Sequence, residues 1–174
     1  VCIVPEKRKE LTTEGGLNLN YKKTFLKKLI DKLKKNKSRV SLFIEPSIKD
    51  IKDSKKLNVD CIEIHTGKLS NLVKTGKNFQ KELKRIKECS FLANDLGIEV
   101  HAGHGLDYKT TKILNKIKAI KEFNIGHFII GESIFDGFKY TIKKFNIKFR
   151  FIYSPIYNLY LKSSLCPLRL SNVM

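Results

Sequence analysis

Five stretches of consecutive apolar residues alternate along this chain with longer amphipathic stretches, and this order limits the folds that are open to it. We predict strands, each an almost continuous apolar run, at residues 1–4, 40–44, 59–64, 98–102 and 123–130. Unbroken apolar runs are typical of parallel strands that helices cover, whereas strands with one solvated face alternate apolar and polar residues. The sequence therefore predicts an α/β protein with a parallel sheet.

The segments between the predicted strands carry helical signals. Residues 21–36 place apolar side chains at helical spacing with lysines between them, and Ser47 is a predicted N-cap. The long region 69–96 is predicted to break at Gly76. Two further helices are expected at residues 110–120 and 131–145.

Five βα units without a GxGxxG motif favour a barrel over a dinucleotide-binding sheet. A complete (β/α)8 TIM barrel needs eight units and about 250 residues, and this chain has 174 residues. We expect residues 1–145 to form the C-terminal part of a single barrel, about its last five βα units, and assign no role to the tail 146–174. Because the chain begins at Val1 and its only methionine is Met174, we expect an N-terminally incomplete fragment.

Composition narrows the classes of partner. The net charge is +18, but only five of the 35 basic residues are arginines, the side chain that reads bases through its bidentate fork. Weak attraction to polyanions is therefore expected, without specific nucleic-acid binding. There is no apolar run long enough for a membrane span, and the four cysteines form no CxxC pair, so we expect a cytoplasmic protein without a membrane partner.

Polar groups gather where the predicted strands end, which is where barrels bind their ligands. All four histidines fall near predicted strand ends, and the groups collected there are Glu6, Thr12, Glu14, Glu45, Glu63, His65, His101, His104, Gly105, Gly126 and His127. Around His104 two interpretations stay open: a general acid or base beside an anion-binding glycine loop, or a polar turn that the histidine caps.

Glu63 interrupts an apolar strand, and a carboxylate there is costly unless it is paired or functional. Loops after the last strands of such barrels often bind phosphate, so a small phosphorylated substrate is expected. Metal binding by the histidines is the competing hypothesis, but their spacing matches no standard zinc site, and we expect neither a metal nor a cofactor.

These residues resemble the pyridoxine 5'-phosphate synthase family of vitamin B6 biosynthesis. The resemblance covers about residues 1–145, and its motifs occur in the family's order. They are Val4-Pro5-Glu6-Lys7-Arg8 with residues 11–17, Val40-Ser41-Leu42-Phe43-Ile44, Ile62-Glu63-Ile64-His65-Thr66-Gly67, Ala102-Gly103-His104-Gly105-Leu106, and Asn124-Ile125-Gly126-His127 with Ile129-Ile130-Gly131.

The resemblance implies a (β/α)8 barrel and a homo-octamer. It implies a transferase that condenses 1-deoxy-D-xylulose 5-phosphate with 3-amino-2-oxopropyl phosphate to pyridoxine 5'-phosphate, phosphate and water. At the matching positions, the resemblance implies that Thr12 contacts the deoxyxylulose phosphate, that His104 is the proton donor, and that Glu63 is the carboxylate that stabilises the transition state. It makes Gly105, Gly126 and His127 the site for the amino-oxopropyl phosphate.

The chain also departs from that pattern. The family's first three strands, with a histidine and a glutamate that act as general bases, have no counterpart here. We therefore expect this piece alone to be poorly folded or inactive. The alternatives are another phosphate-binding barrel enzyme, or an inactive fragment with basic, polyanion-binding character.

Overall fold

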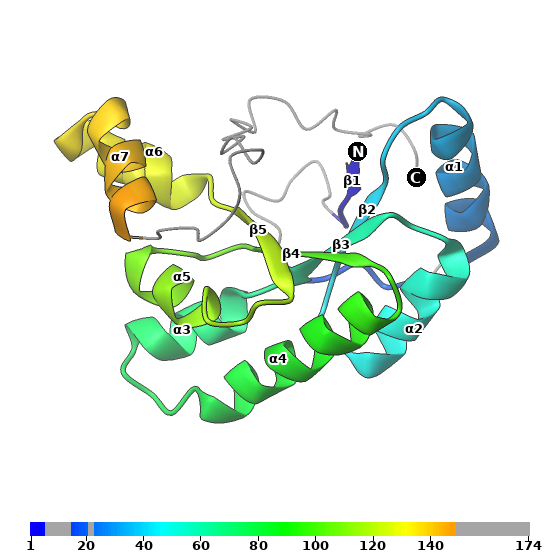
Figure 1. The fold of residues 1–174 in the computed structure, drawn as a ribbon, viewed down its shortest axis with the longest axis horizontal. Helices are drawn as coiled ribbons and strands as arrows, with labels where there is room; N and C mark the ends of the chain where they lie inside the picture. The colour runs from blue at the N-terminus through cyan, green and yellow to red at the C-terminus, as the bar shows by residue number, and fades with distance from the viewer. Residues whose placement is uncertain (6–14, 21–22, 149–174) are drawn as a thin grey trace.

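The computed structural model describes residues 1–5, 15–20 and 23–148 (Figure 1). Within these residues, parallel strands alternate with helices along the chain. The elements are β1 (Cys2–Ile3), α1 (Lys23–Lys35), β2 (Ser41–Ile44), α2 (Ile48–Leu57), β3 (Cys61–His65), α3 (Gly67–Lys74), α4 (Gln80–Asp95), β4 (Glu99–Gly103), α5 (Tyr108–Leu114), β5 (Ile120–Asn124), α6 (His127–Asp136) and α7 (Phe138–Lys148).

The strands form one five-stranded sheet in the order β1-β2-β3-β4-β5, and every neighbouring pair is parallel. Each strand lies beside the next strand of the sequence, and a helix follows each strand. This is the arrangement of a (β/α) barrel, whereas in a doubly wound sheet the order of the strands differs from their order in the sequence. The predicted α/β fold, part of a TIM barrel, is confirmed. The predicted domain boundary at residue 145 stays a prediction.

The two faces of this sheet differ in chemistry because the register of the strands places like residues side by side. On one face lie fully buried apolar side chains, which pack with the helices in a single core: Leu42, Ile44, Ile62, Ile64, Val100 and Ala102. The other face is mostly polar, and it carries Ser41, Phe43, Cys61, Glu63, His65, Glu99, His101 and Asn124. In a closed barrel this second face is the interior, so the polar groups belong to the inside.

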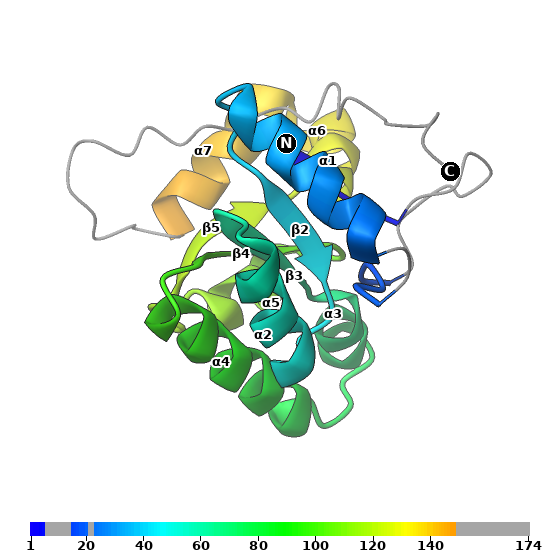
Figure 2. The same cartoon turned by 90° about the vertical axis from the view of Figure 1, so that its right-hand side faces the viewer.

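Helices α2, α3, α4 and α5 lie together on one side of the sheet (Figure 1). Helix α1 and the pair α6 and α7 lie toward the opposite end of the molecule from α4, which both views show (Figure 2). The predicted N-cap is confirmed, since Ser47 Oγ accepts a hydrogen bond from the backbone N–H of Asp50 at 3.4 Å. The predicted break at Gly76 is also confirmed, because the chain there takes a φ of +67° between α3 and α4. Within the described part of the chain, no helix combines the length and the apolar character that crossing a bilayer requires.

Two predictions about the C-terminal units are wrong. The fifth strand is β5 at residues 120–124 and not 123–130, and the helix expected at 131–145 is the pair α6 and α7, which Gly137 separates at a φ of +79°. The strand was misplaced because Lys121 and Glu122 interrupt the apolar run at its start, and the run 123–130 continues into α6. Strand β5 also has a register shift opposite Val100 and His101. Strand β1 lies at the edge of the described sheet, where Cys2 is exposed.

The packing between sheet and helices predicts where stability resides. We expect Ile64→Ala to lower the free energy of unfolding by about 3 kcal/mol, because Ile64 is fully buried and its truncation leaves a cavity. Ile134→Ala is the control, since that side chain is 78% exposed, and we expect a change within about 0.5 kcal/mol. Urea denaturation followed by circular dichroism measures both, and equal losses would contradict the assignment of the core face.

Candidate active site

Glu63 lies in the middle of the polar face of the sheet. Its register partners are Phe43 on β2 and His101 on β4. The carboxylate accepts a hydrogen bond from Asn124 Nδ2 at 2.6 Å, and the Cys2 thiol lies 3.7 Å from the same oxygen. Burial raises the pKa of Glu63 above its ordinary value, although the Asn124 hydrogen bond and the charge of His101 oppose this. Glu63 can therefore hold a proton at a higher pH than an ordinary glutamate.

Space for this carboxylate depends on the glycine at the end of the next strand. A β-carbon on Gly103 would overlap Glu63 Oε1 and would lie 3.3 Å from the β-carbon of Asn124. The register shift in β5 brings Asn124 opposite Gly103, on the same face as Glu63. Glycine at position 103 is thus what lets the Glu63 carboxylate and the Asn124 amide meet above β4.

His104 follows β4 in a left-handed backbone conformation, with a φ of +77°. This conformation is unfavourable for a residue with a side chain, so neighbouring groups must hold it. Thr66, which is fully buried, supplies that restraint: its hydroxyl donates to the carbonyl of Gly103 at 2.7 Å and to that of His104 at 2.8 Å. Its backbone N–H donates to Gly103 as well, at 2.8 Å. The turn that carries His104 is therefore fixed from the end of β3.

Two histidines meet at the carboxyl ends of β3 and β4. The ring centroids of His65 and His104 are 4.9 Å apart at an interplanar angle of 56°. On its other side His65 lies 2.7 Å from a carboxylate oxygen of Glu45, through Nδ1. That same oxygen accepts the backbone N–H of Gly16 at 2.9 Å. Carboxylate, imidazole and second imidazole thus form a continuous row across three consecutive βα units.

The pKa values of Glu45 and His104 are both lowered, which favours the charged form of the carboxylate and the neutral form of the imidazole. The hydrogen bond with His65 lowers the pKa of Glu45, which keeps this carboxylate ionised. Burial lowers the pKa of His104, and the nearby charges of His65, His127 and Lys74 add to the effect. His104 is therefore mostly neutral at neutral pH, and once it has accepted a proton it is a stronger acid than an ordinary histidine.

Of the glycines predicted to bind substrate, Gly105 directly follows His104, and Gly126 precedes His127, whose charge acts on His104. Gly105 has a φ of +72°, and its carbonyl accepts a hydrogen bond from Lys74 Nζ at 2.9 Å. Gly126 is the N-cap of α6, and His127 is the first residue of that helix. The N–H groups of a first helical turn bind anions, because they have no partners inside the helix. The loops after β4 and β5 can therefore hold an anionic group near His104.

His101 does not join this cluster, although the sequence places all four histidines near strand ends. It lies within β4, where its Nε2 is 2.8 Å from Glu99 and its Nδ1 is 3.8 Å from Glu122. Glu99 also pairs with Arg39 at 2.7 Å. These charged groups pair with one another on the polar face near the start of β4. They therefore stabilise the sheet at a distance from the cluster around His104.

Some predicted groups cannot be placed. Thr12, with Glu6 and Glu14, lies outside the described residues. In the described ranges, Cys2, Cys61 and Cys89 are free thiols, and no group of three or more metal-binding side chains comes together.

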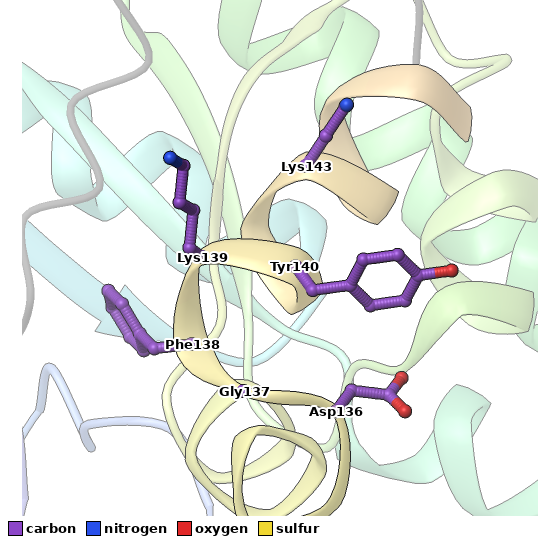
Figure 3. Close-up of a pocket in the computed structure, with 6 residues that line it drawn as sticks. All are labelled: Asp136, Gly137, Phe138, Lys139, Tyr140 and Lys143. Carbon is purple, nitrogen blue, oxygen red and sulfur yellow. The ribbon is translucent and has the colours of Figure 1, made fainter.

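A shallow surface pocket lies apart from the histidines, where α6 meets α7 (Figure 3). The side chains of Phe138 and Tyr140 point away from each other there, and no carboxylate–imidazole pair is present among the residues that line it. Those residues are Asp136, Gly137, Phe138, Lys139, Tyr140 and Lys143.

Sequence reasoning missed one residue of this site and one interaction. Asn124 was placed within a predicted strand, and its contact with Glu63 depends on the register shift in β5, which leaves no simple sequence signal. Glu45 and His65 were both located at strand ends, but their hydrogen bond was not predicted. One signal could have suggested this pair: a carboxylate and a histidine stand at the carboxyl ends of two strands that are predicted to be adjacent and parallel.

Fold and site together define a (β/α)-barrel type of protein with acid–base groups at the carboxyl ends of its strands. The model of the pyridoxal phosphate biosynthesis protein PdxJ family matches residues 1–150. The chain belongs to this family, and the resemblance seen in the sequence motifs is confirmed.

Individual relatives agree with the family assignment. The chain is 62% identical over 145 residues to the pyridoxine 5'-phosphate synthase of Pelagibacter ubique (strain HTCC1062), which covers 83% of this chain and 61% of the relative. The proteins of the same name from Sulfurihydrogenibium sp. (strain YO3AOP1) and Zymomonas mobilis subsp. mobilis (strain ATCC 31821 / ZM4 / CP4) are 46% and 48% identical over 144 residues. Each match covers 83% of this chain, and 58% and 56% of the two relatives. The chain thus spans about three fifths of the length of these relatives.

The contact between Gly103 and Glu63 predicts a specific steric effect. We expect Gly103→Ala to lower the free energy of unfolding by about 1–3 kcal/mol, because the added methyl group displaces the Glu63 carboxylate from Asn124. Gly131→Ala is the matched control: this glycine lies within α6 with no atom near the added methyl group, and we expect a gain of about 0.5–1 kcal/mol. Similar losses in both variants, measured by urea denaturation, would count against the contact.

The raised pKa of Glu63 predicts how stability depends on pH. Because the folded protein binds this proton more tightly than the unfolded chain, the stabilisation is present below the ordinary value of 4.5 and is lost as pH rises through the folded-state pKa. Glutamine does not titrate, so we expect the stability of Glu63→Gln relative to the parent to increase between pH 4 and pH 7.

Urea denaturation at several pH values measures this difference. Glu88→Gln is the control for removing one negative charge from a basic chain, since the Glu88 side chain is 56% exposed on α4. The raised pKa of Glu63 would be refuted if the difference in stability between Glu63→Gln and the parent did not depend on pH. It would also be refuted if that difference changed with pH in the same way as the difference for Glu88→Gln.

Proposed function

We propose that this chain belongs to a pyridoxine 5'-phosphate synthase, which condenses 1-deoxy-D-xylulose 5-phosphate with 3-amino-2-oxopropyl phosphate. The products are pyridoxine 5'-phosphate, phosphate and water. The observation that carries the proposal is the presence of two acid–base groups at neighbouring strands, Glu63 on β3 and His104 after β4, whose pKa values are shifted in opposite directions, together with glycine turns that can hold an anion. Family membership and the names of the relatives support the choice of reaction.

The condensation needs groups that both take and return protons, because carbonyl addition is followed by imine formation and by loss of water. In this proposal neutral His104 accepts a proton in one step. As an imidazolium with a lowered pKa, it gives that proton readily to a departing hydroxyl group. Glu63, positioned by Asn124, stabilises the positive charge that develops on nitrogen during imine formation.

The phosphate groups of the two substrates account for the remaining predicted residues. Gly126 and His127, at the N-terminus of α6, bind the phosphate of the amino-oxopropyl substrate, together with Gly105. Thr12 contacts the deoxyxylulose phosphate. No cofactor enters this scheme, since every step is an addition, a proton transfer or an elimination.

Further properties of the assembled enzyme are part of the same proposal. The enzyme is a transferase of the cytoplasm that acts as a homo-octamer. The general bases that the family carries in its first three strands are not among the residues of this chain, so the chain alone is expected to be inactive.

The test is an assay of the chain joined behind the N-terminal part of the Pelagibacter ubique relative. We expect this chimera to release phosphate and form pyridoxine 5'-phosphate only when both substrates are present, and the 174-residue chain alone to form none. Replacing His104 by alanine, or Glu63 by glutamine, is expected to lower kcat by about 100-fold or more, as is typical for loss of a positioned acid–base group.

Lys143→Ala is the matched control in this assay, because Lys143 is an exposed residue of α7 at the pocket of Figure 3. It should leave kcat unchanged. A folded chimera that converts neither substrate would overturn the proposed reaction and favour another phosphate-binding barrel reaction. A chimera that keeps full activity without His104 and Glu63 would overturn the roles proposed for these two residues.

A further inference from the structure

The pair formed by Glu45 and His65 lies directly against His104, yet neither residue has a role in the proposed reaction. His65 is almost completely buried, with 8% of its side chain exposed, whereas Glu45 is 40% exposed. Their hydrogen bond is 2.7 Å long, and the rings of Phe43 and His65 pack in a T-shaped arrangement with 5.2 Å between their centroids. The imidazole of His65 is therefore fixed on three sides, by Glu45, Phe43 and His104.

The second nitrogen of His65 has no hydrogen-bond partner among the described residues, although it is buried. Such an orphan is unusual, because buried polar atoms are nearly always paired. This Nε2 faces the space above Gly67: a β-carbon there would lie 2.7 Å from His65 Nε2 and 2.8 Å from His104 Cδ2. The absence of a side chain at position 67 is what lets the two imidazoles approach each other.

We propose that Glu45 and His65 form a positioning pair for His104, which holds the His104 ring in place above Gly67 and keeps it neutral until it takes a proton in the reaction. This inference rests on the proposed role of His104. It adds two residues to that role, neither of which needs to touch a substrate.

The electrostatics of the row explain how the pair acts. Glu45 is hydrogen-bonded to the imidazole of His65, and the nearby charge of His65 lowers the pKa of His104. The other charged groups that face His104 are Lys74 on α3 and His127 on α6, which act in the same direction. Arg85 on α4 adds to the field at Glu45 and helps to keep this carboxylate ionised.

The sign of the effect distinguishes this mechanism from a direct one. If the negative charge of Glu45 acted directly on His104, removing it would make His104 lose its proton more easily, and the pKa of His104 would fall. If Glu45 acts through His65, removing it reduces the positive charge on His65, and the pKa of His104 rises. Glu45→Gln therefore gives opposite results under the two mechanisms, and its amide oxygen can still accept the hydrogen bond of Gly16.

The experiment is an NMR titration of the imidazole resonances in the isotopically labelled 174-residue chain, with dispersed amide signals as the check of folding. We expect the midpoint of His104 to shift upward in Glu45→Gln and in His65→Phe. In the double variant we expect no shift beyond that of His65→Phe, because Glu45 then has no intermediary. The titration needs no substrate, so its outcome is independent of whether the chain supports turnover.

Glu99→Gln is the matched control. This substitution also removes a carboxylate that contacts a histidine, since Glu99 lies 2.8 Å from His101 on β4. That pair, however, is not part of the row formed by Glu45, His65 and His104. The proposal requires the shift of His104 in Glu45→Gln to exceed the shift in Glu99→Gln. A downward shift, no shift, or equal shifts in the two variants would overturn it, and Glu45→Gln decides the matter even if His65→Phe does not fold.

Discussion

The alternation of side chains across parallel strands in register is the constraint on which this structure depends. Residues at matching positions of β2, β3 and β4 point to the same side, so one change of register would exchange the apolar face for the polar one. Ile62, Ile64, Val100 and Ala102 reach the helices, while Glu63, His65 and His101 reach the opposite face. The stability of the chain therefore comes from one side of the sheet and its chemistry from the other. The site can hold costly groups because the core does not depend on them.

Close approach is the second requirement of the site, and small residues at two strand ends provide it. Glu63 occupies the space that a side chain at position 103 would fill, and the rings of His65 and His104 meet above Gly67. Both arrangements cost stability, since Glu63 loses solvation and His104 has a left-handed backbone conformation. Thr66 offsets part of this cost with its hydrogen bonds to the carbonyls of Gly103 and His104. A site of this kind, with strain and desolvation held by buried contacts, is typical of positions that function maintains.

Much of this could be predicted from the sequence, because the features that carry it are local. The apolar runs of β2, β3 and β4 and the cap at Ser47 are read from neighbouring residues, and the predicted elements agree with them. Strand β5 was misplaced because the strands were predicted from apolar runs: Lys121 and Glu122 interrupt the apolar character of β5, and the run 123–130 continues into α6. The contact of Asn124 with Glu63 was missed because it depends on the register of β5. Burial and partners of Glu63, and the distance between His65 and His104, depend on residues far apart in the sequence, and no local pattern encodes them.

The shifts within the candidate site have a common logic. Two carboxylates, Glu63 and Glu45, lie one strand apart, yet burial raises the pKa of the first and a histidine lowers the pKa of the second. Their environments thus separate a group that can carry a proton from one that remains an anion, which is how a single fold obtains both acids and bases near neutral pH. His104 lies at the end of the row that begins at Glu45. Burial and the positive groups around it lower its pKa, so its free imidazole is available to accept a proton, and the same surroundings favour release of that proton afterwards.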